Sequence, residues 1–172
     1  MCLLKEKGGM GFWDLKPFNM ALLAKQGWHL QTNSSSLFYK VYKAKYFPRC
    51  DFLEATLGSQ PSFAWGSILS TQAVVKRGVQ WQVGDGEQIQ VWRDKWLHNP
   101  STYRVVTPKR DGLHVTWVCN LIDGDQMEWK EHLIRQCFLP KDVDAILSIP
   151  LSAHGASDRL IWAASKNGKF LV

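Results

Sequence analysis

Apolar residues recur every three to four positions in the first half of the chain, and this is the period of an α-helix. The first such face is formed by Leu15, Phe18, Leu22 and Leu23. Asp14 can cap this helix and Pro17 fits its first turn. The polar stretch that follows, together with Gly27, predicts an end near Trp28 or Leu30.

Two further helices are predicted before residue 79. Ser36 can cap a helix over residues 37–47, and Ser62 can cap one over residues 63–77 with Gly78 just past its end. The apolar face of the last helix is formed by Trp65, Ile68, Leu69 and Val75. Three helices therefore occupy the N-terminal part, and we treat residues 1–78 as one helical region.

The period changes to two from Val79 onward. Val79, Trp81 and Val83 alternate with Gln80 and Gln82, and Ile89 and Val91 alternate with Gln88 and Gln90. Gly84-Asp85-Gly86 lies between the two alternating runs and is a turn sequence. This pattern predicts a Trp-rich β-hairpin, within a second region of residues 79–118.

The remaining residues, 119–172, form a third region with weaker signals. Residues 113–118, which lead into this region, are predicted as a short strand, residues 129–138 and 141–147 as helices, and residues 160–164 and 169–172 as a hairpin that turns at Asn167-Gly168. Because the last strand stops at the end of the chain, we expect a truncated C-terminal part. The fold class is α+β, and we expect Trp65, Trp81, Trp92 and Trp96 to form the core.

Composition bounds this picture without changing it. The chain has 172 residues, of which 45% are hydrophobic and 12% aromatic, enough for one domain or two small ones. The net charge of +6 is unevenly distributed, since residues 1–110 hold 15 Lys/Arg against 7 Asp/Glu and residues 111–172 hold 6 against 8. The basic character therefore belongs to the N-terminal two thirds.

The cysteines and the apolar runs indicate the environment. Cys2, Cys50, Cys119 and Cys137 contain no C-x-x-C pair, and the charged N-terminus does not resemble a signal peptide. No run approaches the roughly 18–20 apolar residues of a membrane span. We expect a reduced, intracellular protein, nuclear or cytoplasmic, with no membrane insertion.

No residue pattern indicates a catalytic or metal site. His114, Cys119, His132 and Cys137 have a spacing similar to small zinc sites, but the pairs fall on different faces of the predicted strand and helix. The aspartates lie mostly in turns, where their side chains bond to nearby backbone. We therefore expect no cofactor, buried thiols with a surface histidine, and no enzymatic activity in this chain.

The second predicted helix combines cations with aromatic rings. Tyr39, Tyr42 and Tyr46 alternate with the candidate nucleic-acid-binding residues Lys40, Lys43, Lys45 and Arg49. Lysines can neutralise phosphates while rings stack on bases, which predicts binding to RNA or single-stranded DNA. The alternative is that Leu37, Val41 and Ala44 face the core and the lysines are only solvated.

Ordered blocks of residues resemble a known family. They are Lys7–Phe12, Phe18–Gln26, Lys43–Pro48, Trp81-x-Val83-Gly84-Asp85-Gly86 and Ile89-x-Val91-Trp92-x-Asp94-x-Trp96-Leu97. Further matches are Leu121-Ile122, Trp129, Ile146, Ile149-Pro150-Leu151, Asp158-x-Leu160-Ile161-Trp162 and Gly168-Lys169-Phe170. Together these resemble plant LINE-type (non-LTR) retrotransposon reverse transcriptases, in the segment between the polymerase and the zinc-binding and RNase H-like regions.

The resemblance implies a connector within a longer polyprotein. The polymerase motif Tyr-x-Asp-Asp of the family would lie before residue 1, and its zinc-binding Cys and His would lie after Val172. The resemblance therefore implies a non-catalytic piece whose partners are nucleic acid and the polymerase and zinc-binding parts. The competing interpretation is a structural or protein-interaction connector with no independent activity.

Overall fold

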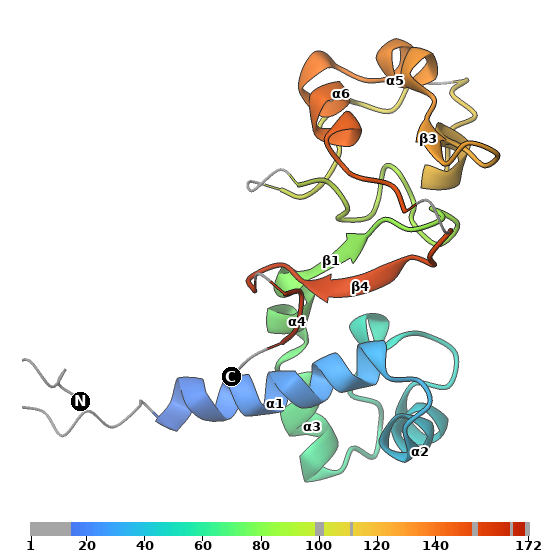
Figure 1. The fold of residues 1–172 in the computed structure, drawn as a ribbon. Coiled ribbons are helices and arrows are strands. Elements are labelled where there is room, and N and C mark those ends of the chain that lie inside the picture. Colours follow the sequence, from blue (N-terminus) through green and yellow to red (C-terminus); the bar gives the residue numbers. More distant parts are fainter. Residues whose placement is uncertain (1–14, 99–101, 111, 153–154, 166, 171–172) are drawn as a thin grey trace, which may run out of the picture. The chain divides into compact units, whose positions relative to one another are not determined.

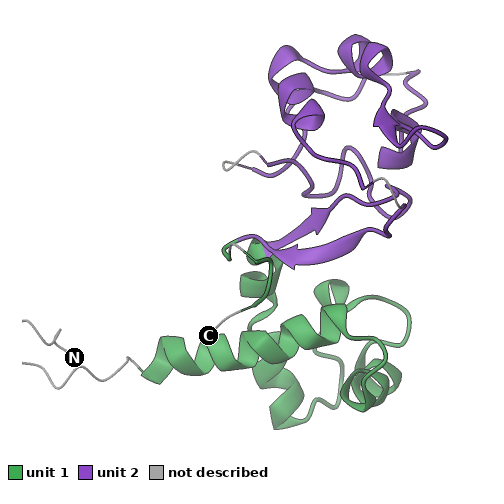
Figure 2. Cartoon of the chain, in the orientation of Figure 1, with its two compact units in different colours: residues 1–78, 164–172 green, residues 79–163 purple. Residues whose placement is uncertain are grey.

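The computed structural model describes residues 15–98, 102–110, 112–152, 155–165 and 167–170 (Figure 1). They divide into two compact units: unit 1 comprises residues 1–78 and 164–172, and unit 2 comprises residues 79–163 (Figure 2). Unit 1 is helical, while unit 2 combines short helices with two antiparallel strand pairs. The predicted α+β fold class is confirmed.

Unit 1 is organised around its longest helix. Its elements are α1 (Leu15–Thr32), α2 (Leu37–Tyr46), the 3-10 helix η2 (Phe52–Glu54), α3 (Phe63–Leu69) and α4 (Gln72–Gly78). α1 contacts each of the other four, so it is the central helix of the unit. Phe170, near the C-terminal end of the chain, also belongs here, with its ring centre 6.5 Å from that of Trp28.

α1 ends at Thr32, beyond the predicted end at Trp28 or Leu30. Gly27 was expected to weaken the helix, but it serves packing instead: a Cβ at this position would lie 2.8 Å from Cζ of Phe52. The missing side chain therefore lets the Phe52 ring reach the helix, and tertiary packing outweighs the lower helix propensity of glycine. Pro17 lies in the first turn as predicted, whereas the proposed cap Asp14 lies outside the described residues.

The predicted helix 63–77 is wrong in one respect, because it is divided into α3 and α4. Ser62 caps α3 as expected, with Oγ accepting a hydrogen bond from the Trp65 amide at 3.2 Å. The hydroxyls of Ser70 and Thr71 donate to the carbonyls of Ser67 and Ile68 at 2.8 and 2.7 Å. Such bonds to the preceding turn bend helices, and they explain the break.

Unit 2 contains two strand pairs, and neither is the predicted hairpin. Its elements are β1 (Val79–Gln82), the 3-10 helix η3 (Val118–Leu121), β2 (Ile122–Asp123), β3 (Glu128–Trp129), α5 (Glu131–Cys137), α6 (Pro140–Leu147) and β4 (Arg159–Trp162). β1 pairs with β4, with Val79 opposite Trp162 and Gln82 opposite Arg159 (Figure 1). β2 pairs with β3. β1 lies where the period of two predicts a strand, but its partner β4 lies about 80 residues away in sequence.

The segment after β1 does not fold back onto it. Residues 86–91 run beside residues 116–119 instead, with an isolated bridge between Gln90 and Trp117 and a hydrogen bond from the Val91 amide to the Thr116 carbonyl at 3.0 Å. The predicted strand at residues 113–118 is reduced to this bridge. The alternation of buried apolar and exposed polar side chains in β1 also fails at Gln80. This side chain is buried, and its amide donates a hydrogen bond to the Leu97 carbonyl at 2.9 Å.

A buried carboxylate explains why the Gly84-Asp85-Gly86 turn adopts this course. Asp158 accepts hydrogen bonds from the amides of Gly84, Gly86 and Gln88, at 2.7, 3.0 and 2.9 Å. A Cβ on Gly84 would lie 2.0 Å from the Ala156 carbonyl oxygen, so only glycine allows this approach. The turn is therefore bound to the residues just before β4, not to a hairpin partner.

The C-terminal elements also differ from the sequence prediction. The predicted hairpin of residues 160–164 with 169–172 does not form within the described residues, because β4 pairs with β1. A turn is present at Asn167-Gly168, where the Gly168 amide donates to the Ser165 carbonyl at 3.1 Å. The helices at residues 129–138 and 141–147 are confirmed as α5 and α6, although Trp129 belongs to β3.

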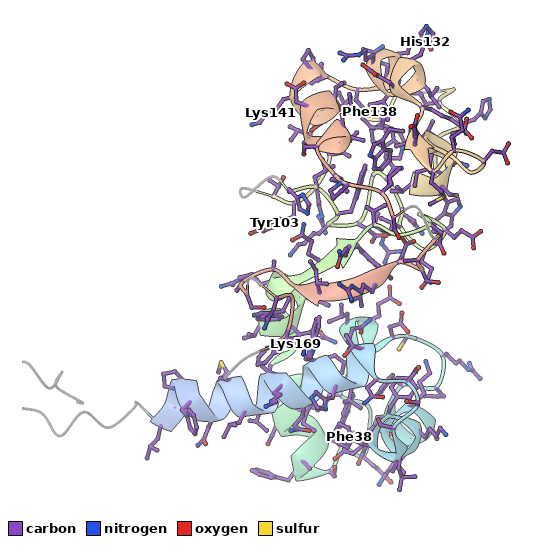
Figure 3. All side chains as sticks on the ribbon, in the orientation of Figure 1. Phe38, Tyr103, His132, Phe138, Lys141 and Lys169 are labelled. Atoms are coloured by element: carbon purple, nitrogen blue, oxygen red, sulfur yellow. The ribbon has the colours of Figure 1, made fainter. Side chains whose placement is uncertain are left out.

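Tryptophans shape the core of unit 2. The core contains Trp96, Val91, Leu97, Val118, Leu121, Ile134, Val143 and Ile146, with Trp81, Trp92 and Trp129 partly buried against it. The indole N–H groups of Trp92, Trp96 and Trp129 donate to the carbonyls of Val115, Val91 and Ile149. Phe138, labelled in Figure 3, stacks on Trp92 at 5.2 Å. The four-tryptophan core is therefore half right: Trp65 and Trp96 are buried, but in different units.

Candidate nucleic-acid interface

α2 carries three of the four predicted nucleic-acid-binding residues, and Arg49 follows it. The helix begins where the sequence predicts, because Oγ of Ser36 accepts a hydrogen bond from the Tyr39 amide at 3.1 Å. It ends at Tyr46, with Phe47 as the C-cap. Lys43 and Lys45 lie in its last turn, where cations interact favourably with the helix dipole.

The rings of α2 pack inside unit 1. Tyr46 and Phe47 stack on Trp65, and their ring centres lie 4.8 and 5.6 Å from that of Trp65. The ring centre of Tyr42 lies 6.1 Å from that of Trp65. Phe52 completes the cluster edge-on at 6.2 Å. Because Trp65 is fully buried, the rings that contact it are used for packing, while the three tyrosines of α2 are themselves half-buried.

The opposite face of α2 is exposed. Leu37 is 76% exposed, Val41 53%, and Ala44 is also exposed. The alternative prediction, in which Leu37, Val41 and Ala44 face the core, is therefore wrong. Helical spacing alone could not decide between the two faces, since both carry apolar groups, and the large rings bury more area than the smaller aliphatic side chains.

The four predicted cations do not act alike. Lys40, Lys45 and Arg49 are exposed, and we call these three residues the α2 basic surface. Lys43 is half-buried: its ammonium donates to the Cys50 carbonyl at 2.7 Å and lies 5.4 Å from the centre of the Phe47 ring. Lys43 therefore holds the loop after α2, and the structure assigns it a different environment from the other three.

Tyr46 connects α2 to α3 next to one of these cations. Its hydroxyl donates to Oγ of Ser62 at 2.7 Å, and the Lys45 ammonium lies 5.1 Å from the centre of its ring. The hydrogen bond with Ser62 lowers the pKa of Tyr46, and the positive charge of Lys45 acts in the same direction.

The charge of unit 1 reinforces that of α2. Residues 15–78 contain eight Lys/Arg and only two Asp/Glu, Asp51 and Glu54, a net charge of +6. Residues 79–163 contain nine Lys/Arg and eleven Asp/Glu, a net charge of −2. The excess of positive charge in the described chain therefore lies on the helical unit, where it favours an anionic partner.

One exposed aromatic residue of α3 was not predicted as a site residue. Phe63, the first residue of α3, is 93% exposed. The sequence pattern predicts Phe63 only as the first residue of a helix, because an apolar residue after a cap does not indicate the direction of its side chain.

The zinc-like pattern does not converge. His114 and His132 are exposed, with His132 labelled in Figure 3, whereas Cys119 is half-buried and Cys137 is buried. Within the described residues, no three His, Cys, Asp or Glu side chains are placed to hold a metal ion. Burial raises the pKa of both thiols, so both stay protonated at neutral pH and are weak nucleophiles.

The aspartates bond to backbone amides. Asp85 and Asp123 accept from the amides of Glu87 and Asp125, two residues on, as the turn interpretation predicts. The buried Asp142 binds the loop before η3 through the amides of Val106 and Thr107, with oxygen–nitrogen distances of 3.0 and 2.7 Å. These carboxylates are engaged in holding loops.

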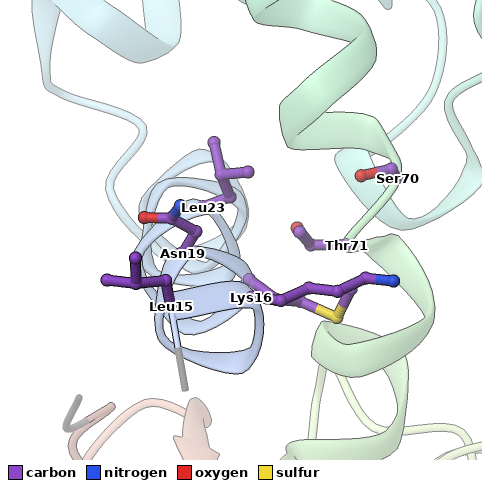
Figure 4. Close-up of a pocket in the computed structure, with 7 residues that line it drawn as sticks. Leu15, Lys16, Asn19, Leu23, Ser70 and Thr71 are labelled. Atoms are coloured by element: carbon purple, nitrogen blue, oxygen red, sulfur yellow. The ribbon is translucent and has the colours of Figure 1, made fainter. Parts of the chain in front are cut away.

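A groove beside the first half of α1 has a mainly apolar and uncharged lining. It has a volume of about 360 Å³ and is lined by Leu15, Lys16, Asn19, Met20, Leu23, Ser70 and Thr71 (Figure 4). Lys16 is the one lining residue with an ionisable side chain, so the groove holds no acid–base pair. Among the described helices, none is both long and apolar enough to cross a membrane.

Two plant proteins are similar to this chain. The "Uncharacterized mitochondrial protein AtMg00310" of Arabidopsis thaliana is 39% identical over 98 residues, which cover 56% of this chain and 64% of that protein. The "Putative ribonuclease H protein At1g65750" of Arabidopsis thaliana is 30% identical over 177 aligned positions, which cover all of this chain and 28% of that protein. No family model matches, and no solved structure matches.

The chain spans 64% of one relative and 28% of the other. The second similarity runs through both units, so the two units occur together within a longer protein named for ribonuclease H.

Proposed function

We propose that this chain is a non-catalytic piece of a longer plant retrotransposon-derived reverse transcriptase, and that its α2 basic surface contacts RNA or single-stranded DNA. The observation that carries the proposal is the division of α2 into two sides. Tyr42 and Tyr46 pack against Trp65, while Lys40, Lys45 and Arg49 remain exposed on a unit with a net charge of +6.

The proposed origin is supported by similarity along the whole chain. The blocks at Phe18–Gln26 and Lys43–Pro48 fall in unit 1, and those from Trp81 to Leu97 and at Asp158–Trp162 fall in unit 2. The relative named for ribonuclease H is similar over both units and is several times longer. In such a protein, the polymerase and zinc-binding parts would be covalent neighbours of this segment.

The chemistry of the surface favours backbone contact over base reading. Lysine and arginine side chains neutralise phosphates irrespective of sequence, and Tyr42 and Tyr46 of α2 pack against Trp65. We therefore expect binding with little sequence preference. Three phosphate contacts on a single strand predict a slope of about −2 in log affinity against log salt, from about −0.7 per contact.

A salt titration of the full chain with fluorescently labelled single-stranded RNA tests this proposal. The triple variant Lys40→Glu, Lys45→Glu and Arg49→Glu should lose binding at low salt, and its salt slope should approach zero. The matched control reverses the same number of exposed cations in unit 2, with Arg104→Glu, Lys109→Glu and Lys141→Glu.

The control variant separates a local surface from overall charge. It should keep most of the affinity and the wild-type slope. An equal loss in both triples would show that only net charge matters, and unchanged binding in the first triple would contradict the proposal.

A second candidate function is a protein-interaction connector, and the exposed apolar side chains of α1 favour it. Leu15 is 73% exposed, and Phe18, Met20 and Leu22 are also exposed in the same half of the helix. A group of exposed apolar side chains of this kind can mark a site of protein contact. This candidate predicts that the α2 charge reversals leave association with the polymerase part of the parent unchanged, while Leu15→Ser with Leu22→Ser weakens it.

A further inference from the structure

Two exposed apolar residues of unit 2 meet although they are distant in sequence. Val106 is 55% exposed and Leu139 is 45% exposed. The Leu139 amide donates a hydrogen bond to the hydroxyl of Thr107, the residue after Val106, at 2.9 Å. In the described part of unit 2, only one other large apolar side chain, that of Trp117, is comparably exposed. The fold therefore brings two of these three residues to one junction.

A buried carboxylate fixes this junction. Asp142, in the first turn of α6, accepts hydrogen bonds from the amides of Val106 and Thr107 at 3.0 and 2.7 Å, and from the Thr107 hydroxyl. Thr107 is buried, and Val105 packs against the core of unit 2. Val106 is thus held outward between two anchored residues. A surface that is already ordered loses less conformational entropy when a partner binds.

Exposed cations border the junction on both of its segments. Each lies within four residues, in sequence, of an exposed apolar side chain, and they are Arg104, Lys109, Arg110 and Lys141, the last labelled in Figure 3. Burial raises the pKa of the Cys137 thiol and the charge of Arg110 opposes this, so Arg110 lies near the end of α5 that precedes Leu139. Among the described residues, none of the four cations forms an ion pair.

The border contains no compensating negative charge. Residues 102–110 and 137–141 hold these four cations and no Asp or Glu, and the nearby Asp142 is buried and bonded to the loop. An apolar centre with a charged border is typical of protein contact surfaces. Carboxylates would complement the cations, and apolar side chains would cover Val106 and Leu139.

The charge of unit 2 favours a short anionic partner over a long one. Residues 79–163 have a net charge of −2 even with the four cations included, so a long polyanion would also meet acidic surface. A short segment responds mainly to charges within about one Debye length, roughly 8 Å at physiological salt. The junction therefore suits an acidic peptide better than a nucleic-acid strand.

We propose that this junction, which we call the unit 2 docking surface, binds a short acidic segment of another protein that also carries apolar side chains. The surface consists of Val106 and Leu139 with the four bordering cations. It is separate from the α2 basic surface, and nothing in it depends on nucleic-acid contact. Each proposal can therefore fail without the other.

Binding of the full chain to a fluorescein-labelled peptide, with two leucines between runs of glutamate, tests this proposal. A peptide with serine in place of leucine and a single-stranded RNA serve as reference ligands. Val106→Gln with Leu139→Gln should weaken binding of the leucine peptide about 10-fold and leave that of the serine peptide within about 2-fold. Arg104→Glu, Lys109→Glu and Lys141→Glu together should weaken binding of both peptides by more than about 10-fold at low salt.

The matched control replaces the same two residue types on α2, with Leu37→Gln and Val41→Gln. These side chains are also exposed and also lie on a helix with exposed lysines, so this control tests position and not composition. Its affinity for the leucine peptide should stay within about 2-fold of wild type. Because every replaced side chain is exposed, all these variants should fold, which circular dichroism checks.

The RNA measurements separate this surface from the proposed function. The unit 2 charge triple should lose the peptides and keep RNA, whereas the α2 charge triple should lose RNA and keep the peptides. Equal loss of RNA and peptide in the unit 2 triple would assign its cations to nucleic acid and overturn the docking surface. Equal affinity of wild type for the leucine and serine peptides would also overturn it, as would loss of the leucine peptide in the α2 control or no peptide binding by wild type.

Discussion

At the scale of single residues, Asp158 and Gly84 determine the course of the chain directly after β1. The Asp158 carboxylate receives three backbone amides from residues 84–88, and Gly84 provides the space for the chain to approach. Gly84 and Asp158 are 74 residues apart in the sequence, so this contact holds two distant segments together.

Asp158→Asn should destabilise the protein by about 2–4 kcal/mol, because an amide group would face donors that now share a buried carboxylate. Urea unfolding followed by tryptophan fluorescence measures the change. The matched control Asp125→Asn, at an exposed turn position, should stay within about 0.5 kcal/mol of wild type. Equal stability of both variants would show that the Asp158 contact does not hold the loop.

At the scale of elements, α2 shows how a helix can be located correctly and yet turned the wrong way. Its cap at Ser36 and its length follow from sequence, but its rings, not its aliphatic residues, face the core. The side of α2 that faces the core also decides where its lysines lie. The Lys43 ammonium donates to the Cys50 carbonyl, while Lys40 and Lys45 are exposed.

Val41→Gln should leave the free energy of unfolding within about 0.5 kcal/mol of wild type, because Val41 is exposed and glutamine favours helix. Tyr42→Ala, one position away, should cost about 2–3 kcal/mol through lost contacts with Phe38, Tyr46 and Trp65. Thermal unfolding by circular dichroism compares the two. If Val41→Gln destabilised the protein more than Tyr42→Ala, the face of α2 with Leu37, Val41 and Ala44 would be the buried one.

At the scale of the whole molecule, the pairing of β1 with β4 links residues that are far apart in sequence. Both strands and the Trp96 core belong to residues 79–163. Long-range pairing of this kind cannot be closed until most of the unit has formed. Unit 2 should therefore behave as one cooperative structure.

An isolated segment of residues 79–163 should fold with a cooperative thermal transition. A segment of residues 79–158, which keeps Asp158 but lacks β4, should lose that transition because β1 is left without a partner. Near-ultraviolet circular dichroism of the tryptophans reports the difference. If the shorter segment unfolds as cooperatively as the longer one, the β1–β4 pair does not contribute to the stability of unit 2.

Local sequence determined the elements whose signals lie within a few residues. The caps at Ser36 and Ser62, the strand at Val79–Gln82, the turn bonding of Asp85 and the helices α5 and α6 all follow from short-range rules. The α+β class and the basic character of the N-terminal part follow from the same patterns. The caps, the Asp85 turn and the helices depend on hydrogen bonds within a few residues, and the strand at Val79–Gln82 is indicated by its local alternation although its partner is distant.

Only the tertiary structure determined which segment each strand or helix face packs against. A period of two predicts a strand but not which strand lies beside it, so β4 replaced the expected hairpin partner and a carboxylate from residue 158 filled the turn. The face of α2 that is buried, the separate environment of Lys43 and the exposure of Phe63 depend equally on where Trp65 packs. Burial is a property of contacts between distant segments, and it therefore decided which cations and which ring remain exposed.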